Sequence, residues 1–163
     1  MAIPLMKQAA DEQGTGEHAT LRTSVAWESG TARAVDARQV LRAFLTCTPP
    51  SGRTPVPAPL AFDAEIVVSE LVTNSILHAP GPCGLVLQLS ADQLAITVWD
   101  TSPDEPEVKK GDRYRVGGHG LRLVHALSDH VAVAFRTMGK QITAHLHLTA
   151  NDGRVLEEQL APA

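Results

Sequence analysis

Apolar residues recur with two different periods in the first half of the chain, and each period predicts a type of element. An alternation of period two over Leu21–Trp27 predicts a strand. Apolar residues then recur every three or four positions, which predicts a helix capped by Thr31 and ended by Pro49. A second helix is expected over about 60–78, where Pro80 follows its last turn.

The second half of the chain predicts two pairs of strands with one helix between them. The strands are expected at 85–90, 94–99, 130–136 and 141–149, and the helix over 121–127. The element order is then β-α-α-β-β-(long loop)-α-β-β. This order predicts an α/β sandwich of the α+β type, in which helices cover one face of a mixed, mostly antiparallel sheet.

The length of 163 residues suits a single domain with short extensions. Residues 1–19 are polar and lack clear periodicity, so we expect a flexible N-terminal arm. The domain itself is expected over 20–150, followed by a C-terminal tail over 151–163.

Charge and cysteine content exclude several classes of protein. Fourteen basic residues against eighteen acidic ones give a net charge of −4, so a broad basic surface for direct nucleic-acid binding is absent. Two cysteines are too few for a disulfide framework. No stretch has the length and apolar character of a signal peptide or a membrane span, and we therefore expect a cytoplasmic protein without membrane contact.

The second predicted helix carries a carboxylate and an amide among apolar neighbours. Glu70 and Asn74 are one turn apart, so their side chains share one face of the helix. Such groups are costly to bury unless they are hydrogen-bonded or coordinated, and a ligand or ion could satisfy them. An internal polar network or a helix edge that water reaches would explain the pair equally well. His78 adds too few donors for a zinc site, whereas oxygen ligands suit Mg²⁺ if phosphates complete its coordination.

Two further features could belong to an anion-binding site. Asp100 ends a predicted strand, where it could either present a ligand group or start a turn. Gly117, Gly118 and Gly120 precede a helix, where free N–H groups and the helix dipole favour a phosphate, although a simple glycine-rich helix start remains an alternative.

Six other polar residues are candidates for binding a phosphate or a metal ion. The long loop before these glycines carries four basic residues: Lys109, Lys110, Arg113 and Arg115. They could cover bound phosphates, or they could simply form a solvated surface. His145 and His147 alternate with apolar residues on the last strand, which favours the solvent face of a sheet over a metal site.

Three motifs in this order and spacing resemble the nucleotide-binding boxes of the histidine-kinase-like ATPases, which have the Bergerat fold. The motifs are Glu70-Leu71-Val72-Thr73-Asn74-Ser75-Ile76-Leu77-His78-Ala79, Val98-Trp99-Asp100, and Gly118-His119-Gly120-Leu121-Arg122-Leu123-Val124. The resemblance covers roughly residues 21–149, and the most similar branch is that of the bacterial anti-sigma-factor serine/threonine kinases.

The resemblance implies Mg-ATP as cofactor and a role for each matching residue. It implies that Asn74 coordinates Mg²⁺, that Asp100 accepts the adenine amino group and that Glu70 is the catalytic base. The other residues that it places at the nucleotide are small or apolar: Ser102, Gly118, Gly120 and Leu121. It further implies a homodimeric regulator that binds a sigma factor and phosphorylates the antagonist of the anti-sigma factor.

The second box departs from the family pattern. Residues 100–104 read Asp-Thr-Ser-Pro-Asp and lack both glycines of the usual Asp-x-Gly-x-Gly. Proline restricts the backbone there, and the second aspartate adds negative charge near a polyphosphate. The alternative function is therefore a partner-binding module of the same fold that binds nucleotide weakly and has lost kinase activity.

Overall fold

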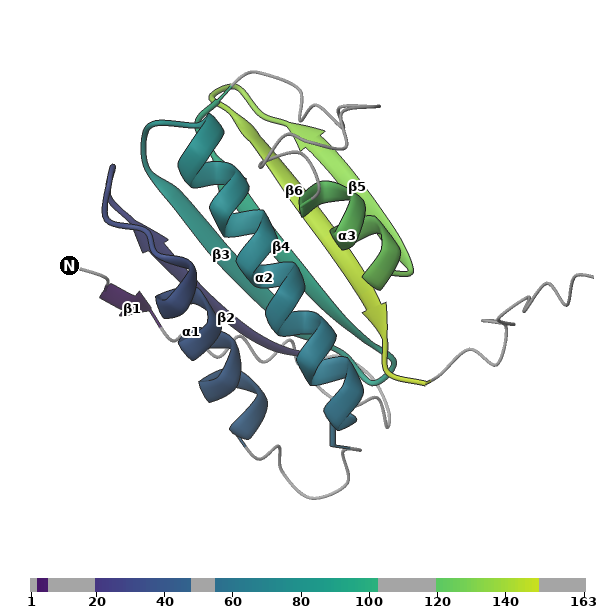
Figure 1. Ribbon diagram of the computed structural model, residues 1–163. Coiled ribbons are helices and arrows are strands. Elements are labelled where there is room, and N and C mark those ends of the chain that lie inside the picture. The colour runs from purple at the N-terminus through teal and green to yellow at the C-terminus, as the bar shows by residue number, and fades with distance from the viewer. Residues whose placement is uncertain (1–2, 6–19, 48–54, 103–119, 150–163) are drawn as a thin grey trace, which may run out of the picture.

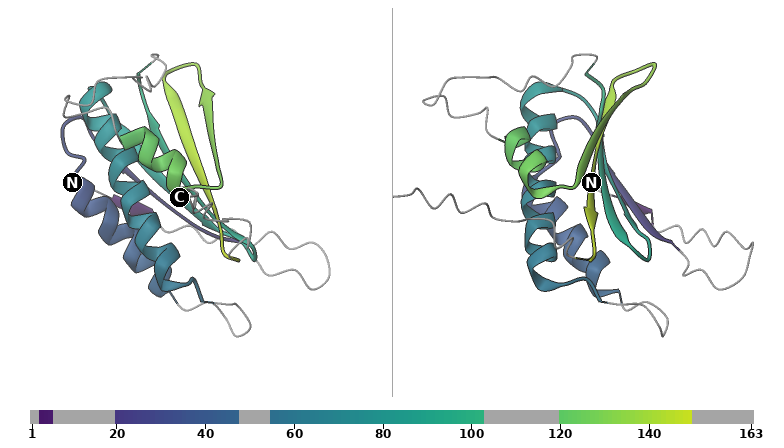
Figure 2. Two further views of the ribbon diagram at one scale, coloured as in Figure 1. Left: turned by 45° about the vertical axis from the view of Figure 1, so that its right-hand side comes forward. Right: turned by 90° about the vertical axis from the view of Figure 1, so that its right-hand side faces the viewer.

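One antiparallel sheet carries three helices on a single face, so the molecule has two layers (Figures 1 and 2). The computed structural model describes residues 3–5, 20–47, 55–102 and 120–149. The elements follow one another as β1 (Ile3–Leu5), β2 (Leu21–Trp27), α1 (Ala34–Thr46), α2 (Ala58–His78), β3 (Cys83–Leu89), β4 (Gln93–Asp100), α3 (Gly120–Leu127), β5 (His130–Phe135) and β6 (Lys140–His147).

The strand order is β1-β2-β3-β4-β6-β5, and every neighbouring pair is antiparallel. The expected fold class and the expected order of elements are confirmed, although the described strands contain no parallel pair and the sheet is therefore not mixed. The structure adds the short strand β1, which pairs with β2 and was not predicted. Residues 6–19 and 151–163, which make up most of the expected arm and tail, lie outside the described residues.

The core lies between the helices and the inward residues of the strands. Period-two alternation turns Leu85 and Leu87 of β3 and Ile96 of β4 toward the helices, where they are fully buried. The central helix α2 covers them with residues such as Leu71, while α1 packs beside α2. Burial of one such side chain contributes roughly 1.5–3 kcal/mol, so this interface holds the two layers together.

Both long helices begin at positions that the sequence did not predict. The hydroxyl of Thr31 does not cap α1; it donates to the carbonyl oxygen of Glu28 at 2.8 Å and closes the preceding turn. Arg33 is the N-cap residue and α1 begins at Ala34. Helix α2 begins two residues earlier than expected because Pro59 is accommodated in its first turn, where a helix needs no N–H donor.

The face of the sheet opposite the helices carries three histidines at one end. His130 and His145 are directly paired on β5 and β6, with ring centroids 5.7 Å apart, and His147 lies two residues farther along β6. This confirms the expected open-face position of His145 and His147. The described residues contain no group of three or more His, Cys, Asp or Glu side chains that could hold a metal ion. Partial burial, followed by repulsion from His130 and His147, lowers the pKa of His145.

This lowered pKa predicts a pH dependence of stability. At pH values between the folded-state pKa of His145 and the ordinary value of 6.5, His145 is mostly protonated in the unfolded chain and mostly neutral in the folded protein. The free energy of unfolding should therefore fall as the pH is lowered through this window. Urea denaturation of His145→Gln should show a shallower fall than the unmodified protein. Equal slopes in the two proteins would contradict the prediction.

Candidate functional site

The candidate site lies where α2 meets the end of β4 and the start of α3 (Figure 1). Helix α2 packs against both of these elements, so its polar side chains reach both. The helix is apolar around most of its circumference, which explains why it is the central helix of its layer. No helix in the described ranges combines the length and apolarity needed to cross a membrane.

Glu70 and Asn74 are half-buried on successive turns of α2. Neither side chain makes a hydrogen bond or ion pair with another described residue. The internal polar network that would have explained them is therefore absent from the described part of the chain. Their carboxylate and amide groups remain available to water or to a ligand. A half-buried amide oxygen is a suitable ligand for a hard cation such as Mg²⁺, particularly if phosphates provide the remaining oxygens.

The carboxylate of Glu70 lies directly against Gly120, the first residue of α3. A Cβ atom at position 120 would overlap Oε2 of Glu70, so any other residue there would require the carboxylate to shift. The carboxylate is thereby placed at the positive end of the α3 dipole. Leu121, the next residue, is buried and packs in the hydrophobic core, where it anchors the first turn of α3.

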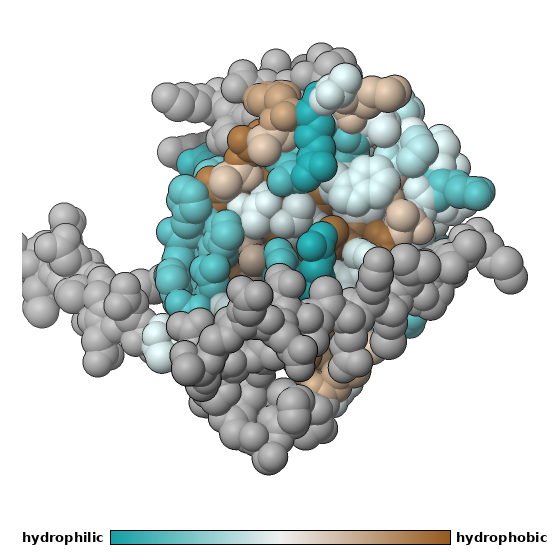
Figure 3. Space-filling model, turned by 180° about the vertical axis from the view of Figure 1, so that it is seen from behind, coloured by the Kyte–Doolittle hydropathy of each residue, from teal (hydrophilic) through white to brown (hydrophobic). Residues whose placement is uncertain are grey.

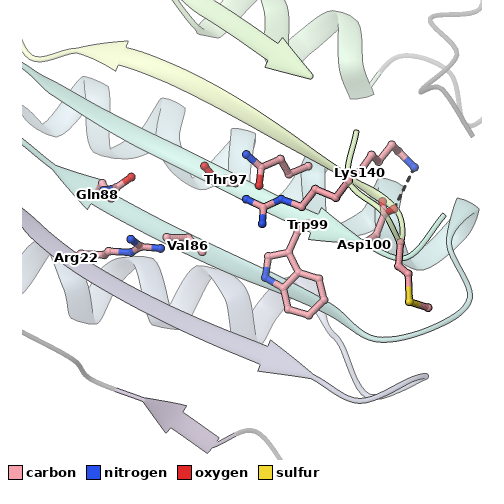
Figure 4. Close-up of a pocket in the computed structure, with 10 residues that line it drawn as sticks. Arg22, Val86, Gln88, Thr97, Trp99, Asp100 and Lys140 are labelled. Atoms are coloured by element: carbon pink, nitrogen blue, oxygen red, sulfur yellow. Dashed lines mark hydrogen bonds and ion pairs between the residues drawn. The ribbon is translucent and has the colours of Figure 1, made fainter. Parts of the chain in front are cut away.

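Asp100 is buried at the end of β4, and both of its carboxylate oxygens accept hydrogen bonds. Oδ1 accepts from the backbone N–H of Ser102 at 3.0 Å and from Nζ of Lys140 at 3.2 Å, and Oδ2 accepts from the hydroxyl of Ser75 at 3.2 Å. Figure 4 shows the contact between Asp100 and Lys140 at the end of the sheet. A carboxylate accepts about four hydrogen bonds, so one acceptor position remains on Oδ2.

Sequence reasoning missed two partners of Asp100, Ser75 and Lys140. Ser75 follows Asn74 on α2 and ties Asp100 to the helix that carries Asn74 and Glu70. Lys140 is directly opposite Asp100 in the pairing of β4 with β6, and both side chains are only 3% exposed. Such a pair is stable only because each charge compensates the other, since an isolated charge would be very costly to bury.

Cys83 is the neighbour of Asp100 on the other side of β4. Burial raises the pKa of the Cys83 thiol, and the negative charge of Asp100 raises it further. The thiol is therefore protonated at neutral pH and is a poor nucleophile.

Part of the expected site lies outside the described residues. These positions are the glycines Gly117 and Gly118 and the basic loop residues Lys109, Lys110, Arg113 and Arg115. Among the described candidates, Ser102 is buried and its backbone is bonded to Asp100, while Gly120 contacts Glu70. The structure therefore joins Glu70 to Gly120 at one end of the site and Asp100 to Ser102 at the other.

Comparison with known protein families yields one match. Residues 29–146 match a family model described as histidine kinase-like ATPase domain. The match covers more than two thirds of the chain and contains Glu70, Asn74, Asp100 and Gly120. A comparison with curated proteins found no match.

Proposed function

Because the chain belongs to the histidine kinase-like ATPase domain family, a family in which the fold serves nucleotide binding, we propose that it binds Mg-ATP and transfers a phosphoryl group to a serine or threonine of a protein partner. The observation that carries this proposal is the pair of polar side chains on α2, Glu70 and Asn74. Glu70 lies beside the start of α3, Asn74 is one helical turn farther along α2, and neither side chain has a partner among the described residues.

Each residue of the site has a task in this proposal. The amide oxygen of Asn74 would hold Mg²⁺, which offsets the negative charge of the phosphates. The free acceptor position on Asp100 would receive the adenine amino group, and Ser102 would keep the carboxylate in place. Gly118 and Gly120 would let the phosphates approach the start of α3, and the side chain of Leu121 would anchor that turn.

Glu70 would orient the hydroxyl group of the partner and accept its proton as the phosphoryl group is transferred. Its carboxylate lies at the start of α3, close to where the phosphates would be bound. Most of the rate enhancement in phosphoryl transfer comes from alignment and electrostatic stabilisation, and a positioned base adds about 10²–10⁴-fold. A single carboxylate in this position is sufficient for that contribution.

The resemblance of the three motifs supports a finer proposal about partners. In it, the protein is a cytoplasmic homodimer that sequesters a sigma factor and phosphorylates the antagonist of the anti-sigma factor. Its regulation would then require protein contacts in addition to the nucleotide site. Incubation with labelled Mg-ATP and the antagonist captured from the native host should yield phosphoserine or phosphothreonine. Absence of any phosphorylated partner despite tight Mg-ATP binding would refute the kinase role.

Replacing the proposed base tests its role separately from nucleotide binding. Glu70→Gln should lower the rate of phosphoryl transfer by about 100-fold, because the amide cannot accept the proton, while the affinity for Mg-ATP changes little. The rate is measured in single turnovers with saturating Mg-ATP. The control is Glu65→Gln, also on α2, whose carboxylate pairs instead with Arg42 of α1 at 2.8 Å. Transfer at the full rate in Glu70→Gln would exclude this residue as the base.

A non-catalytic partner-binding module is the second candidate, and the ion pair between Asp100 and Lys140 favours it. Lys140 occupies one acceptor position of the carboxylate that would recognise adenine, and no glycine follows Asp100 at the two usual positions. Isothermal titration with Mg-ATP separates the candidates. Saturation at micromolar nucleotide supports the kinase, whereas millimolar or absent binding together with tight partner binding supports the module.

A further inference from the structure

The sheet leaves its second face uncovered by any described helix (Figure 2). Hydrophilic and intermediate residues dominate the centre of this open face (Figure 3). Within the described strands β2 to β6, the outward positions contain no aspartate or glutamate. The whole chain carries a net charge of −4, so the absence of acidic groups at these outward strand positions distinguishes them from the protein as a whole.

A pocket of about 450 Å³ lies on the open face and extends to the end of the sheet (Figure 4). Two arginines line it, Arg22 of β2 and Arg136 directly after β5, and both are exposed. The amide side chains of Gln88 and Gln141 also line it. The pocket therefore offers two planar cations and several hydrogen-bonding groups. The carboxylate in its lining, Asp100, is already paired with Lys140 at 3.2 Å.

Trp99 of β4 supplies the apolar wall of the pocket. Its indole ring lies over Gly84 of the neighbouring strand β3, where a Cβ atom would overlap the ring. The glycine thus lets the ring pack against the sheet while it remains half-buried. Tryptophan and arginine are enriched at the centres of protein interfaces, because they combine a large contact area with directed hydrogen bonds.

We propose that this pocket is the docking site for an acidic peptide segment of a partner protein. Carboxylates of the segment pair with the guanidinium groups of Arg22 and Arg136, and one of its apolar side chains packs on Trp99. Arginine binds carboxylates through two parallel hydrogen bonds, which suits this chemistry better than a diffuse positive charge would. The pocket is on the opposite face of the sheet from Glu70 and Asn74, and it meets the proposed nucleotide site only at its end, where Asp100 and Lys140 line it.

The two tryptophans of the chain allow a direct test. Trp27 is buried on the helix-covered face and Trp99 lies on the open face, so their indole N–H resonances report on opposite sides of the sheet. The probe is a short glycine-serine peptide that carries several glutamates and one leucine. Titration of the ¹⁵N-labelled full chain, without nucleotide, should shift the Trp99 resonance and leave Trp27 unchanged. The same peptide with lysines in place of the glutamates should shift neither.

Variants of the exposed arginines complete the test. Arg22→Gln combined with Arg136→Gln should weaken binding of the glutamate peptide by about tenfold, whereas Arg33→Gln, exposed before α1, should not. The proposal is overturned if Trp99 does not respond to the glutamate peptide, or if the lysine peptide acts equally. Equal weakening in Arg33→Gln would also overturn it. A shift produced by free glutamate at the same carboxylate concentration would indicate a small-anion site instead. A shift with protein concentration alone would indicate a second copy of the chain.

Discussion

Replacing Asn74 with alanine is expected to lower the affinity for Mg-ATP by about 100-fold or more, which corresponds to roughly 3 kcal/mol. The side chain is half-buried on α2 and makes no hydrogen bond with the other described residues. Its removal therefore breaks no described hydrogen bond of the folded protein. The expected effect is a loss of ligand affinity and not of stability. The affinity is measured by isothermal titration with and without Mg²⁺.

Three controls separate this effect from general damage to the helix. Thr73→Ala, which alters the neighbouring half-buried polar residue of α2, should bind Mg-ATP within threefold of the unmodified protein. The free energy of unfolding of Asn74→Ala should change by less than about 1 kcal/mol, as for other replacements that leave the core intact. Chelation of Mg²⁺ should weaken binding to the unmodified protein but should have little further effect on the variant. Unchanged affinity in Asn74→Ala would remove Asn74 from the proposed metal site.

Most of the fold could be predicted because the periodic segments of the chain are regular. Strand β2 was predicted with its observed bounds, and the other predicted strands differ from the structure by at most two residues at either end. The predicted start of a helix was wrong where a local hydrogen bond replaced the expected helix cap. Thr31 has the side chain of a helix cap, yet it bonds to Glu28 in the preceding turn. Strand β1 is three residues long, too short for an alternating pattern to be recognised.

The candidate site could be predicted only in part, because its residues are brought together by the tertiary structure. Helical spacing placed Glu70 and Asn74 on one face of α2, but it could not show whether an internal partner satisfied them. The close approach of Glu70 to Gly120 joins residues fifty positions apart in the sequence. Contacts of this kind depend on how α2 and α3 pack, and a single sequence does not contain that information.

One signal for the missed ion pair was present in the alternation of two strands. Counting back in steps of two from the apolar residues of β6 places Lys140 on the core side, and counting forward along β4 does the same for Asp100. Two opposite charges at core-facing positions would each be unfavourable alone, so a direct pair between them is the simplest solution. What the sequence lacked was the register that places the two residues opposite each other.

The same pair predicts the largest change in stability. Lys140→Met should lower the free energy of unfolding by about 3–5 kcal/mol, because it leaves the carboxylate of Asp100 buried without its cation. Urea denaturation at neutral pH measures the change. Combining Lys140→Met with Asp100→Asn should restore part of the loss, since both charges are then removed. If the double variant is destabilised by the sum of the two single effects, the two residues do not interact in the way the structure shows.

The Lys140 variant also distinguishes the two proposed functions when it is titrated with Mg-ATP under conditions in which it remains folded. One acceptor position on Oδ2 of Asp100 is free while Lys140 is in place, so adenine does not have to displace the ammonium group. For a kinase, the affinity of Lys140→Met should then stay within about threefold of the original value. A tenfold gain would mean that Lys140 competes with adenine for the carboxylate. In that case the ion pair holds the site closed to nucleotide, and the partner-binding module becomes the better description of this protein.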